Sequence, residues 1–295
     1  MTIEVNALTK EGRMKDVTFQ IATNEITALI GENGAGKTTL LHLIAGNLHP
    51  SSGSVQFSGY RERDIRSTIG FLPQFPAFHL WMTGLEYLTH IGRLFGLAKN
   101  QAHEQALTLL QLVHLNAKDR QRIETYSGGM KQRLGIAQAL IGDPGILLLD
   151  EPVSALDPIG RTEVMELLLQ LKTGRSILYS THVLHDAEQI SDAYVLMHKG
   201  ELITADTMTS FNNQSETILE IETIDHERLS KRITQCYPHW IVRNKLNFLE
   251  IKTKNEKERA DIAILELLTN GHYQFSAIRK RKKTLADLFR EAVRG

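Results

Sequence analysis

Residues 31–38 read Gly31-Glu32-Asn33-Gly34-Ala35-Gly36-Lys37-Thr38 and match the pattern G-x-x-x-x-G-K-[ST]. An apolar run at 26–30 precedes this stretch, and apolar residues at helical spacing follow it over 38–45. Where glycines leave out the Cβ atom, successive backbone N–H groups can wrap around a phosphate. The order of strand, glycine-rich loop and helix therefore predicts a nucleoside triphosphate site at the end of a sheet strand. We call residues 31–38 the phosphate loop.

Two side chains at the end of the phosphate loop carry its chemistry. The ammonium group of Lys37 can reach the β- and γ-phosphates of a bound nucleotide as a point charge. The hydroxyl of Thr38 can ligate the Mg²⁺ that accompanies such a nucleotide. A glycine-rich turn without function is the simpler alternative, but the flanking strand and helix argue against it.

A second element supplies two adjacent acids. Four apolar residues at 146–149 are followed directly by Asp150 and Glu151. The apolar run predicts a buried strand that delivers both acids to the carboxyl edge of the sheet, where α/β proteins bind ligands. We expect Asp150 to hold Mg²⁺ through its outer shell and Glu151 to polarise a water for attack on the γ-phosphate.

Three further polar residues follow short apolar runs or the acids. Gln74 comes after 69–72, His182 ends the stretch 178–182, and Asp157 lies shortly past the second acid. A lone histidine of this kind is more often structural or solvated than functional. Because parallel strands end at one sheet edge, we expect these residues near the phosphate loop, as candidate sensors of the γ-phosphate.

Residues 126–133 read Tyr-Ser-Gly-Gly-Met-Lys-Gln-Arg and introduce a helical pattern. Ser127, Gly128 and Gly129 stand at the start of that helix, where open backbone N–H groups favour an anion. The stretch contains no acid or metal ligand of its own. We call residues 127–129 the Ser-Gly-Gly turn and predict that it binds a phosphate without catalytic groups of its own.

The composition narrows the class of protein. The 295 residues carry no net formal charge, so overall charge favours neither nucleic acid nor a membrane surface. A single cysteine, Cys236, cannot form a disulfide within the chain and fits a reducing compartment. No apolar run approaches the roughly 18 residues that cross a bilayer, and the start of the chain reads as a strand. We therefore expect a cytoplasmic protein that reaches a membrane only through a partner.

The pattern along the chain predicts two domains. Residues 1–210 alternate apolar strands with helices at 38–45, 101–112 and 160–171, which favours an α/β core with a largely parallel sheet. A polar stretch predicts a linker at 211–217. Residues 218–295 read as βαββαβ and predict a small α+β domain of the ferredoxin-like type; its elements are expected at 218–221, 227–236, 240–243, 248–252, 257–268, 273–278 and 285–292.

Residues 1 to about 210 resemble the nucleotide-binding domain of ATP-binding-cassette (ABC) proteins, whose six motifs occur here in the family's order. The resemblance implies an α/β P-loop NTPase fold with a helical subdomain, ATP and Mg²⁺ as cofactors, and ATP hydrolysis. It implies catalytic roles for Lys37, Gln74, Glu151 and His182, and metal binding by Thr38, Gln74 and Asp150. The nucleotide contacts that it implies are Gly31, Glu32, Asn33, Gly34, Ala35, Gly36, Lys37, Thr38, Thr39, Ser127, Gly128, Gly129 and Asp157.

In this family two cassettes pair head to tail, as a homodimer or as a heterodimer of paralogues. The resemblance implies that the Ser-Gly-Gly turn of one chain contacts the γ-phosphate held by the phosphate loop of the other. The helix that follows would direct the positive end of its dipole at that phosphate. This arrangement explains why the turn carries no catalytic residue of its own.

The chain departs from the family pattern at two places. Tyr126 and Met130 stand where the family usually has leucine and glutamine, which removes a group that could bond the opposing ribose. The family also places an aromatic residue before the phosphate loop to stack on adenine, but here no aromatic residue precedes Phe19. Arg13 could substitute by stacking its planar guanidinium, and it joins the expected nucleotide contacts.

Two segments of the sequence indicate which partners the chain could bind. Residues 75–88 are rich in aromatic and apolar side chains and suit a groove that receives a helix of a membrane permease. Residues 279–283 form a basic run, which is either a solvated strand edge or a contact to anionic lipid; we expect no nucleic acid, because aromatic residues do not interleave with the charges. The segments and the C-terminal domain resemble ATPase subunits of bacterial antibiotic-type exporters. An importer subunit and a non-transport switch ATPase remain as alternatives.

Overall fold

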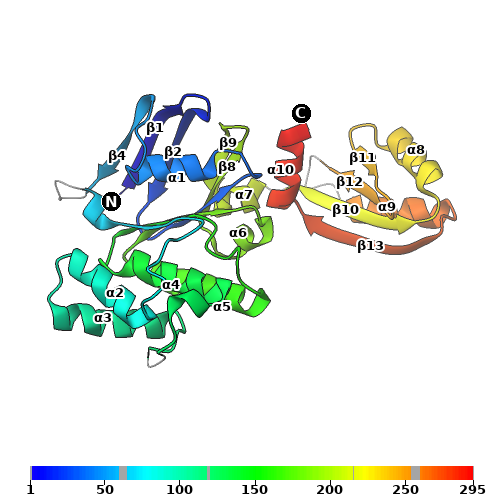
Figure 1. Cartoon of the computed structure of the whole chain (residues 1–295). Coiled ribbons are helices and arrows are strands. Elements are labelled where there is room, and N and C mark those ends of the chain that lie inside the picture. The colour runs from blue at the N-terminus through cyan, green and yellow to red at the C-terminus, as the bar shows by residue number, and fades with distance from the viewer. Residues whose placement is uncertain (1, 60–64, 118–119, 215, 254–259, 295) are drawn as a thin grey trace. The chain divides into compact units, whose positions relative to one another are not determined.

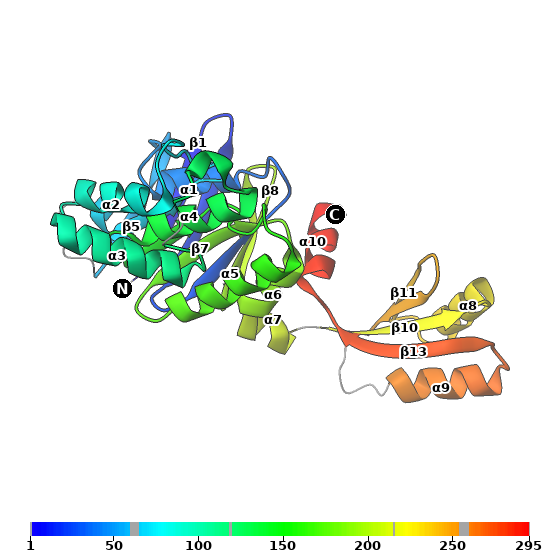
Figure 2. The same cartoon turned by 60° about the horizontal axis from the view of Figure 1, so that its bottom comes forward.

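The structure, a computed structural model, describes residues 2–59, 65–117, 120–214, 216–253 and 260–294. The chain divides into two compact units, Met1–Met208 and Thr209–Gly295, which Figures 1 and 2 show from two directions. None of the helices in these described ranges combines the length and apolar character that a bilayer crossing requires. Each unit is considered by itself below.

The first unit alternates strands with helices, as the sequence predicts. Its strands are β1 (Thr2–Lys10), β2 (Met14–Ala22), β3 (Ile26–Ile30), β4 (Ser52–Ser58), β5 (Ile69–Leu72), β6 (Ile146–Leu149), β7 (Ser176–Thr181), β8 (Ala193–His198) and β9 (Glu201–Thr207). Its helices are α1 (Lys37–Ile44), α2 (Gly84–Leu94), α3 (Lys99–Leu112), α4 (Gly128–Leu140), α5 (Pro158–Leu171) and α6 (Leu184–Ile190). Helix α7 (Met208–Gln214) lies at the boundary between the units.

Two sheets form the first unit. The larger has the strand order β5-β6-β7-β3-β8-β9, in which all pairs are parallel except β8 with β9. Strands β3 and β6 are buried along their whole length, because both faces of a parallel sheet are covered. The smaller sheet is antiparallel, with the order β2-β1-β4. The parallel strands therefore bring the ends of β3, β6 and β7 to one edge of the larger sheet.

Helix α1 joins the two sheets into one core. Leu40, Leu41 and Ile44 of this helix are buried in a cluster that includes Val5 and Phe19 of the smaller sheet. The same cluster contains side chains of the larger sheet, namely Leu29, Ile146, Leu148, Leu178 and Val195. The helix that follows the phosphate loop is consequently fixed on two sides, and the loop begins from a rigid support.

Helices α2, α3 and α4 form a helical subdomain, in which α2 packs on α3 and both contact α4 (Figure 1). Thr83 and Glu86 begin α2 with a capping box, since each side chain accepts a hydrogen bond from the other residue's backbone N–H. Ser127 caps α4 by accepting a hydrogen bond from the Met130 N–H at 3.2 Å. The predicted helical subdomain is thus confirmed, and the Ser-Gly-Gly turn lies at one of its helix starts.

The predicted linker at 211–217 overlaps a helix that the sequence did not predict. Residues 208–214 form helix α7, and the next strand begins at Thr217. Met208 and Phe211 are both buried, and their spacing of three places them on one face of the helix. Because the neighbouring residues are polar, the composition of this segment did not predict that Met208 and Phe211 share a buried helix face.

The second unit has the predicted βαββαβ order. Its elements are β10 (Thr217–Thr223), α8 (His226–Cys236), β11 (Ile241–Asn244), β12 (Leu249–Lys252), α9 (Ala260–Asn270), β13 (Phe275–Lys282) and α10 (Leu285–Arg294). The four strands form an antiparallel sheet in the order β11-β12-β10-β13, which is the arrangement of a ferredoxin-like domain. The expected helix at 257–268 begins within 254–259, which lie outside the described residues.

A core of apolar side chains joins this sheet to its two helices. Leu229 and Ile233 of α8 and Ile264 and Leu268 of α9 are fully or almost fully buried against Leu249, Ile251 and other strand residues. Trp240 is also buried in this cluster, stacked on Tyr237 with the ring centroids 4.1 Å apart. The second unit therefore has a hydrophobic core of its own, which is the property of a domain.

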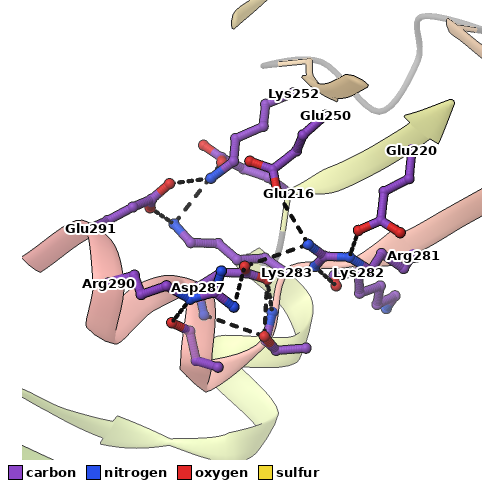
Figure 3. A network of polar contacts seen from close by, with 12 residues as sticks. Glu216, Glu220, Glu250, Lys252, Arg281, Lys282, Lys283, Asp287, Arg290 and Glu291 are labelled. Carbon is purple, nitrogen blue, oxygen red and sulfur yellow. Dashed lines mark hydrogen bonds and ion pairs between the residues drawn. The ribbon is translucent and has the colours of Figure 1, made fainter. Parts of the chain in front are cut away.

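Helix α10 is attached to the sheet by charges (Figure 3). The Arg281 guanidinium contacts Glu220 at 2.6 Å, Asp287 at 2.5 Å and Glu250 at 3.4 Å. Glu291 of the helix pairs with Lys252 and, at 2.6 Å, with Lys283. Within the basic run at 279–283, Arg279 and Lys280 also pair with acids, Glu222 and Asp261. The run is therefore largely neutralised, which weakens the interpretation as a lipid contact.

The network changes the pKa values of its acids. Burial alone would raise the pKa of Asp287, but hydrogen bonds from Arg281 and Thr284 outweigh it and hold the pKa at about 2. Burial likewise opposes the effect of Lys252 and Lys283 on Glu291, whose pKa is lowered in sum. Both carboxylates therefore favour the folded state at pH values where the unfolded chain also ionises them.

We predict that Asp287→Asn lowers the free energy of unfolding of the second unit by about 2 kcal/mol at pH 7. Removing one partner of a fully buried pair costs about 3–5 kcal/mol, but Arg281 retains Glu220 and Glu250 and is partly exposed. Urea unfolding of the full chain tests this, followed by the fluorescence of Trp240 in a Trp81→Phe background. Glu222→Gln, which removes the exposed pair with Arg279, is the matched control and should cost less than about 0.5 kcal/mol.

The difference in the free energy of unfolding between wild type and Asp287→Asn should depend on pH in a defined direction. A carboxyl with a lowered pKa stabilises the fold fully above its unfolded pKa of about 4. That contribution is lost as the pH falls through the folded value of about 2. The difference between wild type and Asp287→Asn should therefore be constant from pH 7 to about 5 and shrink below pH 4. A difference that grows as the pH falls below 4 would contradict the assignment.

Candidate nucleotide-binding site

The phosphate loop connects β3 to α1 and has little freedom of conformation. Gly36, directly before α1, has a φ of +100°, which side chains other than glycine rarely adopt. A Cβ at Gly31 would lie 2.6 Å from the carbonyl oxygen of Met197 in the neighbouring strand β8. The glycines of the motif are thus required by backbone conformation and by a neighbouring strand, in addition to any approach of a phosphate.

Lys37 begins α1 and is almost completely buried, with 6% of its surface exposed. Its Nζ donates hydrogen bonds to the carbonyl oxygens of Gly31 at 2.7 Å and Glu32 at 3.0 Å. Burial lowers the pKa of this ammonium group, and the nearby charges of Glu151 and Asp150 act in the opposite direction. The positive charge is therefore held inside the curve of the loop, close to the two acids.

Asp150 follows β6 and is held by two hydroxyl groups. Its Oδ2 accepts a hydrogen bond from Thr38 Oγ1 at 2.7 Å, and its Oδ1 accepts one from Ser180 Oγ at 2.6 Å. Only 1% of the residue is exposed. A hydroxyl and a carboxylate in contact at the edge of the phosphate loop are the hard oxygen ligands that Mg²⁺ selects, and Mg²⁺ takes its remaining ligands from water and phosphates. The residues present therefore fit the predicted ion.

Glu151 lies beside Asp150 and faces His182. The Nδ1 atom of His182 is 3.3 Å from Oε1 of Glu151, and half of the histidine side chain is exposed. Glu151 also borders a cavity of about 460 Å³ that is lined by Gln74 and the phosphate loop. The residues that line the cavity are Gly12, Arg13, Asn33, Gly34, Ala35, Gly36, Lys37, Thr38, Thr39, Gln74 and Glu151. Gln74, Glu151 and the phosphate loop, which were predicted from separate parts of the sequence, thus line one cavity.

Arg13 reaches the cavity from the turn between β1 and β2. The backbone fixes this turn to the phosphate loop, since Lys15 donates to the Gly200 carbonyl at 2.9 Å and Gly200 donates to the Ala35 carbonyl at 3.1 Å. A Cβ at Gly200 would meet the carbonyl oxygen of Arg13 at 2.5 Å. Sequence reasoning missed Gly200, whose role depends on a contact between distant turns.

Six of the predicted nucleotide contacts do not line this cavity, namely Gly31, Glu32, Ser127, Gly128, Gly129 and Asp157. The Ser-Gly-Gly turn stands at the start of α4, where Ser127 and Gly128 are exposed. Asp157 is exposed and caps α5, its Oδ1 accepting a hydrogen bond from the Gly160 N–H at 2.8 Å. Tyr126, one of the departures noted above, is buried, and its hydroxyl oxygen would lie 2.8 Å from a Cβ at Gly84. The tyrosine therefore packs inside the helical subdomain.

Comparison with known proteins places this geometry in a family. Residues 14–154 match the family described as ABC transporter. The uncharacterized ABC transporter ATP-binding protein YxlF of Bacillus subtilis (strain 168) is 50% identical over 204 residues, which cover 69% of each chain. The bacitracin transport ATP-binding protein BcrA of Enterococcus faecalis is 34% identical over 245 residues, which cover 80% of this chain and 79% of the relative.

A solved structure with the same fold shows a cassette after hydrolysis. It is the dimeric post-hydrolysis state of the ATP-binding cassette MJ0796 bound to ADP and Pi, with 25% sequence identity and a TM-score of 0.64. The match covers 70% of this chain and 98% of that chain. The identity to YxlF, the fold and the meeting of phosphate loop and acids agree, so the chain belongs to the ABC transporter ATP-binding proteins and is an ABC-type ATP hydrolase.

Proposed function

We propose that this chain hydrolyses Mg²⁺-bound ATP in a head-to-tail pair of cassette chains and thereby powers export through a separate membrane-spanning permease. The observation that carries the proposal is the separation of two half-sites on one chain. The phosphate loop and the acids line one cavity, whereas the Ser-Gly-Gly turn is exposed at the start of α4. An exposed phosphate-binding turn suits a nucleotide held by another chain. The dimeric state of MJ0796 supports this pairing.

We assign a role in this reaction to each group in or beside the cavity. Lys37 and the backbone N–H groups of the phosphate loop bind the phosphates and offset their charge. Glu151 accepts a proton from a water molecule as the water oxygen bonds to the γ-phosphorus, and the bond to the leaving oxygen of ADP breaks. His182 contacts the Glu151 carboxylate and orients it. Gln74 borders the same cavity, where it can contact the attacking water or the metal ion.

Mg²⁺ would be held by Thr38 and Asp150, with Gln74 as a further oxygen ligand. When bound, the ion neutralises charge on the β- and γ-phosphates. The contact of 2.7 Å between the Thr38 hydroxyl and the Asp150 carboxylate keeps both oxygens at the mouth of the phosphate loop. The chain's own contribution is therefore to fix these oxygens before the nucleotide arrives.

A permease partner fits the surface of the helical subdomain. In the segment 75–88, Phe75 is 84% and Trp81 is 65% exposed, while Tyr87 and Leu88 belong to the core. Trp81 lines a hollow together with Thr83, Leu85, Glu86, Ala117, Arg120 and Arg122. An exposed aromatic side chain in a hollow that also contains charged residues suits a site that receives a partner helix. Through this contact the chain would lie at the inner face of the membrane.

Transport of an antibiotic-type compound is supported by the name of one of these relatives, whereas the direction of export rests on the resemblance of the sequence to exporter subunits. BcrA is named for bacitracin transport, and its match extends over a larger share of this chain than the first compact unit does. The likeness therefore includes part of the second unit, which we propose as an accessory domain over 218–295 beside a cassette domain over 1–210.

Exchange of Glu151 and of Lys37 should separate chemistry from binding. Glu151→Gln keeps the shape but cannot take a proton, so we expect turnover to fall by at least about 100-fold with ATP affinity nearly unchanged. Lys37→Ala removes a charge from the phosphates and should weaken ATP binding itself. Steady-state ATPase assays and equilibrium titrations measure the two effects. Turnover at the wild-type rate in Glu151→Gln would exclude the proposed proton acceptor.

The exposed turn should act on the second chain. Ser127→Arg places bulk and positive charge where the γ-phosphate of the opposing nucleotide docks. We expect each chain still to bind ATP, whereas dimerisation induced by ATP is lost. The measurement is size-exclusion chromatography with ATP and Mg²⁺ in a Glu151→Gln background, which prevents hydrolysis. Thr108→Arg, on the exposed surface of α3, is a control for added charge. Undiminished dimerisation of the Ser127 variant would remove the turn from the interface.

Arg13 should make the site tolerant of the base. Stacking on an aromatic side chain is worth roughly 1–3 kcal/mol per base in nucleic-acid binders, and this chain has no aromatic residue before Phe19. The phosphates would then supply most of the affinity, so ATP and GTP should bind within about tenfold of each other. Arg13→Ala should weaken both nucleotides and Arg13→Tyr should tighten both in a competition titration. A wild-type preference for ATP above a hundredfold would refute this.

A further inference from the structure

The backbone of Glu151 is held in an unusual conformation. Its φ is +49°, in the left-handed region that a residue with a side chain adopts only at a cost of order 1–3 kcal/mol. The residue lies directly after Asp150, where the buried strand β6 turns into the loop that precedes α5. Because this backbone sets the direction of the Glu151 side chain, whatever keeps it in place also sets the position of the carboxylate.

Ser180 holds both acids with one hydroxyl group. It lies in β7, the neighbour of β6, and is fully buried. Its Oγ accepts a hydrogen bond from the Glu151 N–H at 2.8 Å and donates one to Asp150 Oδ1 at 2.6 Å. A hydroxyl has one proton to donate and lone pairs to accept with, so a single serine can serve both acids at once.

Gln132 holds the other polar group of the same residue. It lies in the first turns of α4, where only 3% of its surface is exposed, and its Nε2 donates to the Glu151 carbonyl at 3.2 Å. Ser154 adds hydrogen bonds to that carbonyl from its N–H at 3.2 Å and its hydroxyl at 3.1 Å. The backbone of Glu151 is therefore bonded by side chains from β7 and from the helix that begins with the Ser-Gly-Gly turn.

We propose that Ser180 and Gln132 are positioning residues for ATP hydrolysis, which fix the strained backbone of Glu151 so that its carboxylate faces the water to be activated. Ser180 has the larger role, since it also orients the Asp150 carboxylate toward Thr38. The inference rests on the proposed role of Glu151 as proton acceptor. Neither residue borders the cavity, so neither contributes to nucleotide affinity directly.

Ser180→Ala tests the first part in the full-length protein. We expect kcat to fall roughly 10- to 100-fold, the loss typical of a displaced catalytic group. The KM for ATP should change by less than about threefold. Ser176→Ala is the matched control: Ser176 is also buried in β7, but its hydroxyl donates to the Ala22 carbonyl at 3.0 Å, away from the site. An unchanged kcat, an equal loss in the control, or a loss confined to KM would overturn the role of Ser180.

Gln132→Met gives a second test that does not depend on the folding of the serine variant. Methionine keeps the length of the side chain but cannot donate to the Glu151 carbonyl, and kcat should fall by about threefold or more at constant KM. The control is Gln138→Met in the same helix, where the lost contact is to the Tyr87 hydroxyl at 2.9 Å. An equal fall of kcat in both glutamine variants would overturn the role of Gln132.

Glu151→Gln measured beside these variants distinguishes two kinds of failure. If it retains turnover, the proposed proton acceptor is wrong and the positioning role is overturned with it. If it loses turnover while Ser180→Ala and Gln132→Met do not, only the positioning role is overturned. Loss of turnover in Glu151→Gln, Ser180→Ala and Gln132→Met, with both controls active, supports the inference.

Discussion

The carboxylate of Asp150 is the point at which the site is assembled. A buried ionised carboxylate is costly unless hydrogen bonds replace its water, and here two hydroxyl groups do so. Thr38 comes from the start of α1 and Ser180 from β7, so the contacts join the phosphate loop, the acid strand and a third strand. The sheet order β6-β7-β3 makes this geometry necessary, because β7 lies between the strand that carries the acids and the strand that carries the loop. The rest of the cavity depends on that junction.

Sequence alone predicted the parts of the site that local chemistry marks. The glycines before Lys37 and the acids after an apolar run can be recognised in the sequence, because the residues that form the pattern are the same residues that carry the function. Ser180 could not be found in this way, since its role depends on which strands are neighbours. Gln132 was likewise hidden, because it serves Glu151 from another element. Helix α7, which overlaps the predicted linker, was not expected for a related reason: the pair Met208 and Phe211 is recognised as buried only once the helix is known.

The second unit is stabilised in a different way from the first. Its small core is supplemented by ion pairs that attach α10 to the sheet, with Glu250, Lys252 and Asp287 almost fully buried. Removing one charged residue from this network leaves its partner without a compensating charge. The network therefore favours one position of helix α10 on the sheet, even where its net contribution to stability is small. The βαββαβ order was predictable from the alternation of strands and helices. The sequence did not predict that the basic run at 279–283 forms ion pairs with acids. Four of its cations face acids of other segments, and the run does not act as a free patch.

The distribution of burial separates the groups that folding fixes from those that would meet a second chain in the proposed head-to-tail pair. Lys37, Asp150 and Glu151 are buried and hydrogen-bonded within one chain, so their geometry is set by folding. Ser127 and Asp157 are exposed, and the side chain of each caps a helix. Capping leaves N–H groups at the start of α4 open toward solvent, where a phosphate brought by another chain would find them. In such an arrangement the chemical groups are in place beforehand, and the arrival of the second chain completes the charge environment of the γ-phosphate. ATP hydrolysis would then occur only when two chains are paired. This dependence is what an ATPase needs if it is to drive a membrane partner.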